Sequence, residues 1–409
     1  MSAKHPFHEL AVSADGKYLF AAVQSSIQKF DLATGQLVAT FTVASEPESE
    51  KKVTSSTSGE GAKCARDLIV TRDGKHVVAF TNANKSVLVL NSSDLTLVSQ
   101  RKFPKRPSTL CTSFDDARLL VGDKFGDVYD VELLSTEEIV KPSDGKTEDV
   151  ASIEPILGHV SMLTDVELVE KNGHQYILSS DRDEHIRVTR YPQAFVVERW
   201  LFGHEQFVAA MAVPLWAPGF VISGGGDDFV AVFKWCPEQG EEPLKSTLDL
   251  RPYFGQYLSE DVHSAPRRKK DAPNPDAPLE ITVDRIVAAR DGLLVVHAEA
   301  TGVLVVLSLD RESGALQHKH TFVRAGGARI VAVATDGSGR LYVSLDPSVG
   351  EAVPLLEVYN VSETGEITLA DSASDISKTI AEVGSVAVVG EEPSVALYSV
   401  RHLRKRGEH

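Results

Sequence analysis

Residues 154–166 read EPILGHVSMLTDV, and SSDRDEHIRV follows at residues 179–188. A Gly-His pair thus stands before an apolar stretch, and serine and aspartate come about twenty residues later. Histidine, serine and aspartate together form either a catalytic triad or the buried, hydrogen-bonded bracing of a β-sheet. The same arrangement returns at Gly203-His204 and in SGGGDDF at residues 223–229. Because a catalytic triad has no reason to be duplicated, the repetition favours the bracing of a repeated sheet.

Short β-rich segments separated by turn signals recur along the chain. Residues 11–37 begin with an Asp-Gly turn, continue through two alternating strands and end at a Thr-Gly turn, and residues 68–95 repeat this plan. Helical periodicity is nearly absent, so these segments predict strands. Further units begin near residues 111, 158, 203, 286 and 330. Seven such units predict an all-β fold, a seven-bladed β-propeller of the WD-repeat type.

The length of the chain indicates insertions between the blades. Seven units over 409 residues give roughly 58 residues each, above the roughly 40 to 45 of a WD repeat. Residues 44–63 are polar and rich in serine and glutamate, and residues 259–279 are charged and rich in proline, so both are expected to be flexible. We therefore expect a single propeller over residues 1–409, with two flexible insertions and a basic C-terminal tail at residues 401–409.

The composition argues against several classes of protein. The formal net charge is -16, so the surface as a whole repels nucleic acid and anionic membranes, and any RNA contact needs a local basic patch or a partner. Cys64, Cys111 and Cys236 show no CxxC spacing, which argues against a disulfide framework and a zinc site. The N-terminal residues lack the apolar segment of a signal peptide, and no run approaches a membrane span. We expect a soluble intracellular protein without membrane contact.

The repeated polar residues are interpreted as a structural network within the blades. In the fourth and fifth units a histidine is expected to pair with an aspartate through a serine, because buried polar groups must find partners. A tryptophan is expected to close the fifth unit. The residues of this network are His159, Ser179 and Asp183 in the fourth unit, and His204, Ser223, Asp227 and Trp235 in the fifth.

No enzymatic site stands out beside this network. No GxSxG segment supplies the exposed nucleophile of a hydrolase. SGGGDDF at residues 223–229 could be a nucleotide loop, but such a loop leads from a strand into a helix, whereas the following FVAVFKW alternates like another strand. The segment is therefore predicted to be a turn, and we expect no catalytic, cofactor-binding or metal-binding residues.

Several motifs resemble one protein family. EPILGHVSMLTDV, SSDRDEHIRVTRYPQ, WLFGHEQFV, KRPSTL, DKFGDVYDV and the terminal LRKRGEH are similar to the non-catalytic WD-repeat subunit of the eukaryotic tRNA (guanine-N7)-methyltransferase, in its fungal form. The resemblance is dense between residues 101 and 235, recurs at both ends and is faint from 250 to 390. It implies a nuclear protein that forms a heterodimer with a Rossmann-type methyltransferase.

The resemblance also implies a role. The chain would stabilise the catalytic subunit and support N7-methylation of the variable-loop guanosine in tRNA, with S-adenosylmethionine on the partner and no cofactor of its own. A generic WD-repeat scaffold in a ubiquitin ligase or chromatin complex is the alternative, since propellers host many partners. An enzyme in its own right is the weakest hypothesis.

Arg187 is the main candidate for contact with the partner. In DEHIRVTRYP, alternation places Ile186 and Val188 on one face of a strand and Arg187 on the other, away from the core. In the family that the chain resembles, the basic residue at this place faces an acidic residue of the catalytic subunit. Asp181 and Arg182, in the preceding turn, are assigned to the same interface. The alternative for Arg187 is an exposed strand residue of little consequence.

A local basic cluster is the candidate for contact with tRNA. RKFPKRPSTL, residues 101–110, carries Lys102, Lys105 and Arg106, and Lys124 stands in DKFGDVY. On an acidic protein such a cluster indicates contact with phosphate or with an acidic partner. The alternative is that these residues contact neither and are simply the solvated charges of a loop.

Three further segments carry weaker hypotheses. Phe125 is either an exposed contact or a core residue, and we expect the core. PRRKK at residues 266–270 is either a nuclear localisation signal or a charged linker. The tail at residues 401–409 is expected either to dock on the partner or tRNA or to be frayed.

Overall fold

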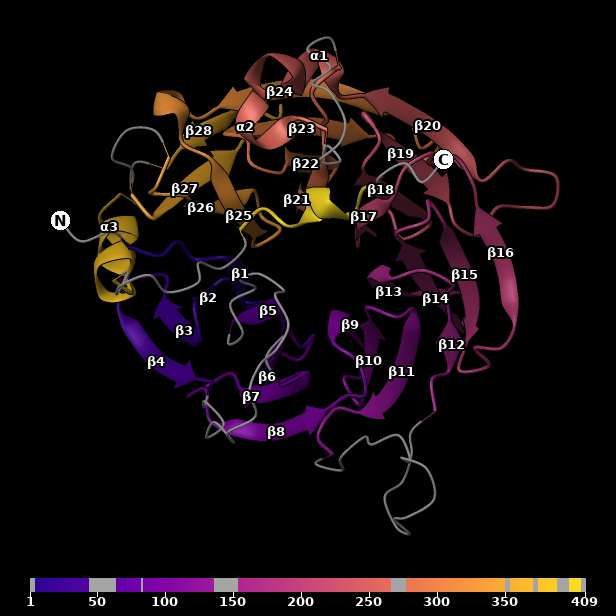
Figure 1. Ribbon diagram of the computed structural model, residues 1–409, viewed down its shortest axis with the longest axis horizontal. Coiled ribbons are helices and arrows are strands. Elements are labelled where there is room, and N and C mark those ends of the chain that lie inside the picture. Colours follow the sequence, from indigo (N-terminus) through magenta and orange to yellow (C-terminus); the bar gives the residue numbers. More distant parts are fainter. Residues whose placement is uncertain are drawn as a thin grey trace, which may run out of the picture.

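The computed structural model describes residues 4–43, 64–81, 84–135, 154–265, 277–349, 354–370, 374–387 and 397–405. These residues contain seven four-stranded sheets, which stand in a ring around a central axis (Figure 1). The prediction of an all-β, seven-bladed propeller is therefore confirmed. The insertion at 44–63 and the basic segment at 266–270 lie outside the described residues.

Each blade is built from four strands that are consecutive in the sequence. Blade 1 holds β1 (Glu9–Val12), β2 (Tyr18–Val23), β3 (Ser26–Asp31) and β4 (Leu37–Thr42), and blade 2 holds β5 (Ala65–Val70), β6 (His76–Thr81), β7 (Ser86–Asn91) and β8 (Leu97–Lys102). Blade 3 holds β9 (Pro107–Thr112), β10 (Arg118–Asp123), β11 (Asp127–Glu132) and β12 (Leu157–Gly158), and blade 4 holds β13 (Leu163–Lys171), β14 (His174–Asp181), β15 (Ile186–Tyr191) and β16 (Val197–Leu201). Blade 5 holds β17 (Val208–Ala212), β18 (Phe220–Gly225), β19 (Phe229–Lys234) and β20 (Leu244–Asp249). Blade 6 holds β21 (Val283–Arg290), β22 (Leu293–Ala298), β23 (Val303–Leu309) and β24 (Leu316–Val323), and blade 7 holds β25 (Ile330–Thr335), β26 (Arg340–Leu345), β27 (Leu356–Val361) and β28 (Ile367–Leu369).

The Asp-Gly pairs form the turns between the first two strands of the early blades. In blades 1 and 2 a hydroxyl two residues before the aspartate donates to its carboxylate, at 2.7 Å for both Asp15 and Asp73. Gly16 and Gly74 follow with φ of 67° and 70°, a conformation that glycine adopts without strain. In blade 3 Asp116 takes this position with φ of 53°, which aspartate tolerates better than most residues.

The hydrophobic core lies in the gaps between neighbouring blades. Ile186 and Val188 of blade 4 pack in one cluster with Val221 and Phe233 of blade 5, and all four are almost fully buried. Every residue of β18 is buried, whichever face of the sheet its side chain occupies. The middle strands of a blade are thus covered on both faces, so their alternation does not separate core from solvent.

The connection between blades 5 and 6 is partly helical. It contains α1 (Arg251–Phe254), the 3₁₀ turn η1 (Gly255–Tyr257) and α2 (Glu260–His263). Phe254 is fully buried, and Val262 and His263 are buried as well. Residues 259–265, which were expected to begin a flexible insertion, contain α2, and Val262 and His263 of this segment are buried.

The ring closes between blades 7 and 1 through a helix that the sequence analysis did not identify. α3 (Ser374–Val383) follows blade 7, and Ile380 packs in one cluster with Phe30 of blade 1 and Val358 of blade 7. Beyond the helix, the backbone N–H of His5 donates to the carbonyl of Val386 at 3.0 Å. The described residues also contain the 3₁₀ turns η2 (Ala325–Gly327) and η4 (Val400–Leu403). No helix of the described residues is long and apolar enough to span a membrane.

Candidate functional site

The blade 5 network joins the predicted histidine, serine and aspartate. His204 Nδ1 lies 2.7 Å from Asp227 Oδ2, and His204 Nε2 lies 2.7 Å from Ser223 Oγ. Trp235 is buried, but its indole N–H donates to the carbonyl of Pro218 at 2.7 Å and not to the serine. SGGGDDF spans the end of β18, a turn and the start of β19, so it leads from strand to strand as predicted.

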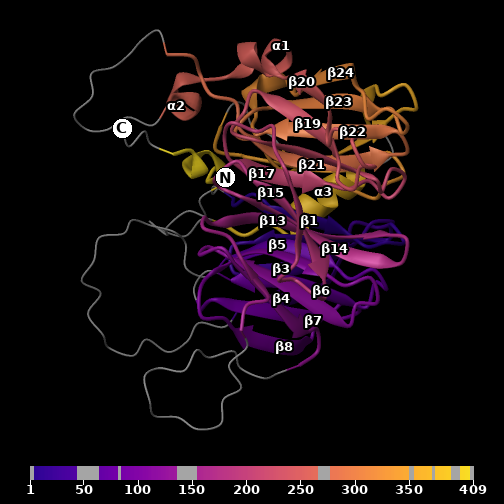
Figure 2. The same ribbon diagram turned by 90° about the vertical axis from the view of Figure 1, so that its right-hand side faces the viewer.

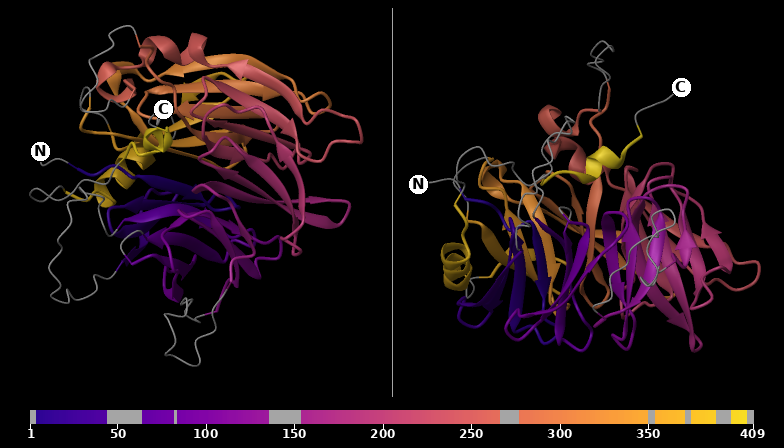
Figure 3. Two further views of the ribbon diagram at one scale, coloured as in Figure 1. Left: turned by 45° about the vertical axis from the view of Figure 1, so that its right-hand side comes forward. Right: turned by 60° about the horizontal axis from the view of Figure 1, so that its bottom comes forward.

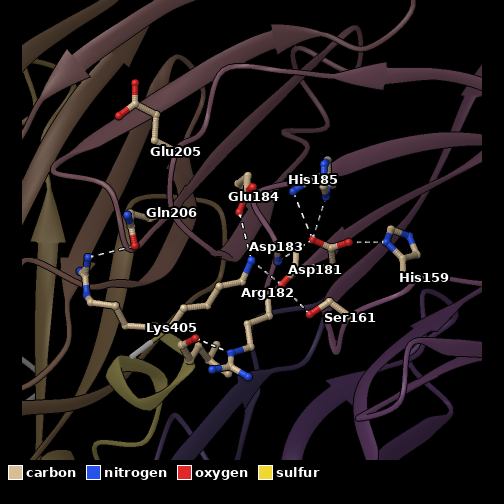
Figure 4. Close-up of polar contacts among 12 residues, drawn as sticks. His159, Ser161, Asp181, Arg182, Asp183, Glu184, His185, Glu205, Gln206 and Lys405 are labelled. Atoms are coloured by element: carbon tan, nitrogen blue, oxygen red, sulfur yellow. Dashed lines mark hydrogen bonds and ion pairs between the residues drawn. The ribbon is translucent and has the colours of Figure 1, made fainter. Parts of the chain in front are cut away.

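In blade 4 the aspartate of the network is Asp181 and not Asp183. His159 Nδ1 lies 2.8 Å from Asp181 Oδ2 (Figure 4). His159 Nε2 lies 2.8 Å from Ser179 Oγ. Asp183 instead accepts a hydrogen bond from Ser161 Oγ at 2.8 Å. The predicted pairing of His159 with Asp183 was therefore wrong.

The two blades use different aspartates because they differ in the residue two positions after the serine. In blade 5 that residue is Gly225, and a Cβ there would collide with the carbonyl oxygen of Phe207, so only Asp227 can reach the histidine. In blade 4 the same position is Asp181. Its carboxylate also accepts the backbone N–H groups of Asp183 and His185, at 2.8 and 3.2 Å, so the turn folds around it.

The electrostatics of the blade 4 network suit a structural role. Burial lowers the pKa of His159 and outweighs the opposing effect of its hydrogen bond with Asp181. Burial acts to raise the pKa of Asp181, but the hydrogen bonds from His159 and from the backbone lower it overall. The pair is thus a neutral imidazole beside a carboxylate, with side chains only 1% and 4% exposed. Within the described residues, no three His, Cys, Asp or Glu side chains are grouped to hold a metal ion.

Blade 6 contains a further histidine network that the sequence analysis missed. His297 Nδ1 lies 2.7 Å from Asp284 Oδ1, and its Nε2 lies 3.3 Å from the carbonyl of Thr301. Here the histidine is on β22 and the aspartate is on β21, so no Gly-His pair marks the site. The only signal in the sequence was a histidine within the apolar segment LLVVHA, residues 293–298.

Arg187 does not point away from the core as alternation predicted. Its side chain lies between blades 3 and 4, where Nη1 donates to the carbonyl of Gly158 at 3.0 Å and the guanidinium is 5.5 Å from the centre of the Trp200 ring. The residue is only 7% exposed. The prediction was wrong because Ile186 and Val188 face blade 5 while the opposite face of the sheet is covered by blade 3. Nε and Nη2 of Arg187 have no hydrogen-bond partner among the described residues.

Exposed aromatic residues lie beside Arg187. Trp200 is 37% exposed and Phe202 is 68% exposed. His185 lies between them, with ring centres 5.4 Å from Trp200 and 6.5 Å from Phe202. We call His185, Trp200 and Phe202 the aromatic patch. Surface aromatic clusters of this kind favour contact with another protein.

The other two residues assigned to the interface differ from expectation. Asp181 is only 3% exposed and belongs to the His159 network, so it shapes the turn and is not itself a surface contact. Arg182 is half-buried, and its Nε donates to the carbonyl of Leu403 at 2.6 Å. The C-terminal tail is therefore docked on its own propeller up to Lys405, the last described residue.

The predicted basic cluster gathers at one end of blades 2 and 3. Lys102 ends β8, Lys105 and Arg106 follow it, and the backbone N–H of Lys124 donates to the carbonyl of Arg106 at 3.0 Å. These four side chains are exposed or half-buried. Phe125 is 62% exposed, and Lys105 Nζ lies 4.1 Å from the centre of its ring. Placing Phe125 in the core was therefore wrong, because it occupies the tip of a turn.

Comparison with solved structures supports the fold alone. The WD40 repeats of RRP9 match with a TM-score of 0.61 at 12% identity, covering 83% of this chain and 87% of that one. A chain of the mitotic checkpoint complex matches with a TM-score of 0.59 at 12% identity, covering 87% and 90%. Both likenesses are to chains of distant sequence, at 12% identity.

Comparison with known sequences is more specific. The family described as "tRNA methyltransferase TRM82 WD40 domain" matches residues 42–155 and 137–354. Relatives named tRNA (guanine-N(7)-)-methyltransferase non-catalytic subunit TRM82 include one from Debaryomyces hansenii, 32% identical over 99% of this chain and 100% of the relative. Another from Saccharomyces cerevisiae is 30% identical over the full length of both chains. The chain therefore belongs to the family of non-catalytic WD-repeat subunits of the tRNA (guanine-N7)-methyltransferase.

Proposed function

We propose that this chain forms a heterodimer with the catalytic subunit of the tRNA (guanine-N7)-methyltransferase, stabilises it and supports N7-methylation of the variable-loop guanosine in tRNA. The similarity over the full length to relatives named as non-catalytic subunits carries this proposal. S-adenosylmethionine would bind the catalytic subunit, and the complex would act in the nucleus.

The surroundings of Arg187 support a protein interface. Two nitrogen atoms of its buried guanidinium have no acceptor in the described chain, and an unsatisfied buried donor costs about 1 to 3 kcal/mol. Because both nitrogens are covered in the free chain, we propose that the side chains around Arg187 shift on binding and that a carboxylate of the partner then accepts an N–H group from each of them. The adjoining Trp200 and Phe202 would then lose their contact with water.

Co-purification tests the proposal against the generic scaffold. The tagged full-length chain, purified from its native cell, should bring down a methyltransferase of Rossmann type in a one-to-one complex. Components of a ubiquitin ligase or a chromatin complex in its place would favour the alternative.

The basic cluster is proposed to contact tRNA phosphates. Changing Lys102, Lys105 and Arg106 together to glutamate should weaken tRNA binding by the heterodimer and make its salt dependence shallower. The slope of log K against log salt falls by roughly 0.7 to 0.9 for every phosphate that is no longer neutralised, so a decrease of about two is expected. Fluorescence anisotropy with labelled tRNA across a salt series measures this slope.

A triple variant with the same change of charge serves as control. Lys17, Lys75 and Lys378 are each about 70% exposed or more, and the first two lie in turns at the opposite end of the blades from Lys124. Glutamate at these three positions should leave the slope unchanged. If the two triple variants have equal slopes of log K against log salt, the basic cluster does not contact tRNA and its residues are solvated charges of a loop.

A further inference from the structure

The C-terminal segment crosses one face of the propeller as a strap. Residues 397–405, here called the C-terminal strap, include η4 (Val400–Leu403). η4 lies near the inner strands β17 and β21 in the view down the axis (Figure 1). It projects on the same face as α2 in the side views (Figures 2 and 3). The strap therefore extends over the end of the ring, clear of its outer rim.

The first part of the strap is fixed to blades 7 and 6. Tyr398 donates its hydroxyl to Asp346 Oδ2 at 2.7 Å. The backbone N–H groups of Val400 and Arg401 donate to the two carboxylate oxygens of Glu299, at 2.7 and 2.8 Å. Glu299 is only 3% exposed. A buried carboxylate with two backbone donors from the strap marks a built docking site, since a frayed end would not supply them.

Arg404, the penultimate residue of the strap, fixes it to blades 5 and 6. Its Nη2 donates to the carbonyls of Gly226 and Ile281, at 2.7 and 3.0 Å. Its Nε lies 2.9 Å from Glu280 Oε2, and its side chain is only 13% exposed. The guanidinium therefore links the β18–β19 turn of blade 5 to the segment just before β21 of blade 6.

The end of the strap reaches the turn of blade 4 between β14 and β15. Leu403 accepts a hydrogen bond from Arg182 Nε at 2.6 Å (Figure 4). Lys405 Nζ lies 3.1 Å from Asp183 Oδ1 and 3.8 Å from Glu184 Oε2. Three consecutive residues of this turn thus contact the strap.

The same turn carries part of the aromatic patch. His185 is its last residue, and the His185 ring packs on Trp200 and Phe202. Arg187 stands two residues later, on β15. Any shift of the turn would therefore move His185 relative to Trp200 and Arg187.

We propose that the C-terminal strap is a positioning element for binding of the catalytic subunit. It holds the turn at residues 182–185 so that His185 and the other aromatic residues form one preorganised surface beside the buried Arg187, and Lys405 offsets the negative charges of Asp183 and Glu184 at the rim of that surface. Ordering this turn before binding removes an entropic cost from association. The identity of the partner rests on the proposed function, whereas the role of the strap in the turn does not.

Reversal of the charge at Lys405 tests this role in the full-length chain. Lys405 is 54% exposed, so Lys405→Glu should leave the fold intact. Amide hydrogen exchange at residues 182–187 of the free chain should become about tenfold faster, because the turn loses its ion pairs with Lys405 and gains a like charge beside Asp183 and Glu184. Affinity for the catalytic subunit, measured by calorimetry, should fall about fivefold. Lys405→Arg should keep both properties.

Lys378→Glu is the matched control, because Lys378 is exposed on α3 and should affect neither measurement. If Lys405→Glu has the same amide exchange rates and the same affinity for the catalytic subunit as the unmodified chain, the inference is overturned. Faster exchange with full affinity would also overturn it, since the turn would then be held by the strap without any effect on the partner. If the unmodified chain fails to bind the catalytic subunit, the proposed function is wrong, and the exchange data still show whether the strap holds the turn.

Discussion

Replacing Arg187 by methionine is expected to weaken the heterodimer by roughly thirtyfold or more, because loss of one member of a buried charge pair at an interface costs about 2 to 5 kcal/mol. The free propeller should change in stability by only about 1 kcal/mol, since the guanidinium donates to Gly158 and leaves two nitrogens without an acceptor in the described chain. Calorimetric titration with the catalytic subunit and chemical denaturation of the free chain measure the two effects separately.

Arg190→Met is the control on the same strand. Arg190 is 53% exposed and pairs with Glu198, so its loss should not affect association. Glutamate at position 187 is a less useful variant, because it would place a second carboxylate beside Asp181 in a buried site. Undiminished affinity in a folded Arg187→Met variant would remove Arg187 from the interface.

Asp181→Ala is expected to lower the free energy of unfolding by about 3 kcal/mol, whereas Asp183→Ala should cost less than about 1 kcal/mol. Asp181 accepts hydrogen bonds from two backbone N–H groups, contacts His159 and is almost fully buried. The Asp183 side chain is 30% exposed, and its polar contacts within the described chain are with Ser161 and Lys405. Guanidinium chloride denaturation of the two variants measures the difference.

Asp227→Ala in blade 5 is the reference for this comparison, because Asp227 occupies the equivalent network with His204. Its cost should match that of Asp181→Ala. A larger loss of stability in Asp183→Ala than in Asp181→Ala would contradict the hydrogen bonding described for blade 4.

Local turn chemistry made the fold predictable. Asp-Gly pairs such as Asp15-Gly16 and Asp73-Gly74 form turns with the backbone conformation that glycine allows, wherever they stand in the chain. The Gly-His pairs marked blades 4 and 5 because each histidine lies in the connection before a blade and finds its aspartate in that blade. The number of blades and the absence of a strand-to-helix loop at residues 223–229 followed from these short-range signals.

Side-chain placement depended on neighbours that no local pattern shows. Alternation along β15 separates two faces, but it cannot tell that blade 3 covers the face of Arg187. The choice between Asp181 and Asp183 depended on the space beside the turn, which in blade 5 is closed at Gly225 by the carbonyl group of Phe207. Asp181, two residues after Ser179, was visible in the sequence and could have been weighed.

Long-range docking was the least predictable feature. The last described residues of the tail bind Glu299, Glu280 and Asp183, each more than 100 positions away in the sequence. Their basic side chains predicted an acidic partner or tRNA, and in the structure Arg404 and Lys405 pair with acidic side chains of the same chain. α3 was missed because its apolar residues Ile376 and Ile380 mark only one short helical face amid strand patterns.

Reconstitution of tRNA methylation from the two purified subunits tests the central claim most directly. Unmodified tRNA and S-adenosylmethionine are supplied, and 7-methylguanosine in the variable loop is quantified for each subunit alone and for mixtures of increasing ratio. We expect no product from this chain alone and a rate for the mixture at least about tenfold above that of the catalytic subunit alone, saturating at one chain per catalytic subunit. A mixture no more active than the catalytic subunit alone, or methylation by this chain without a partner, would contradict its assignment as the accessory subunit.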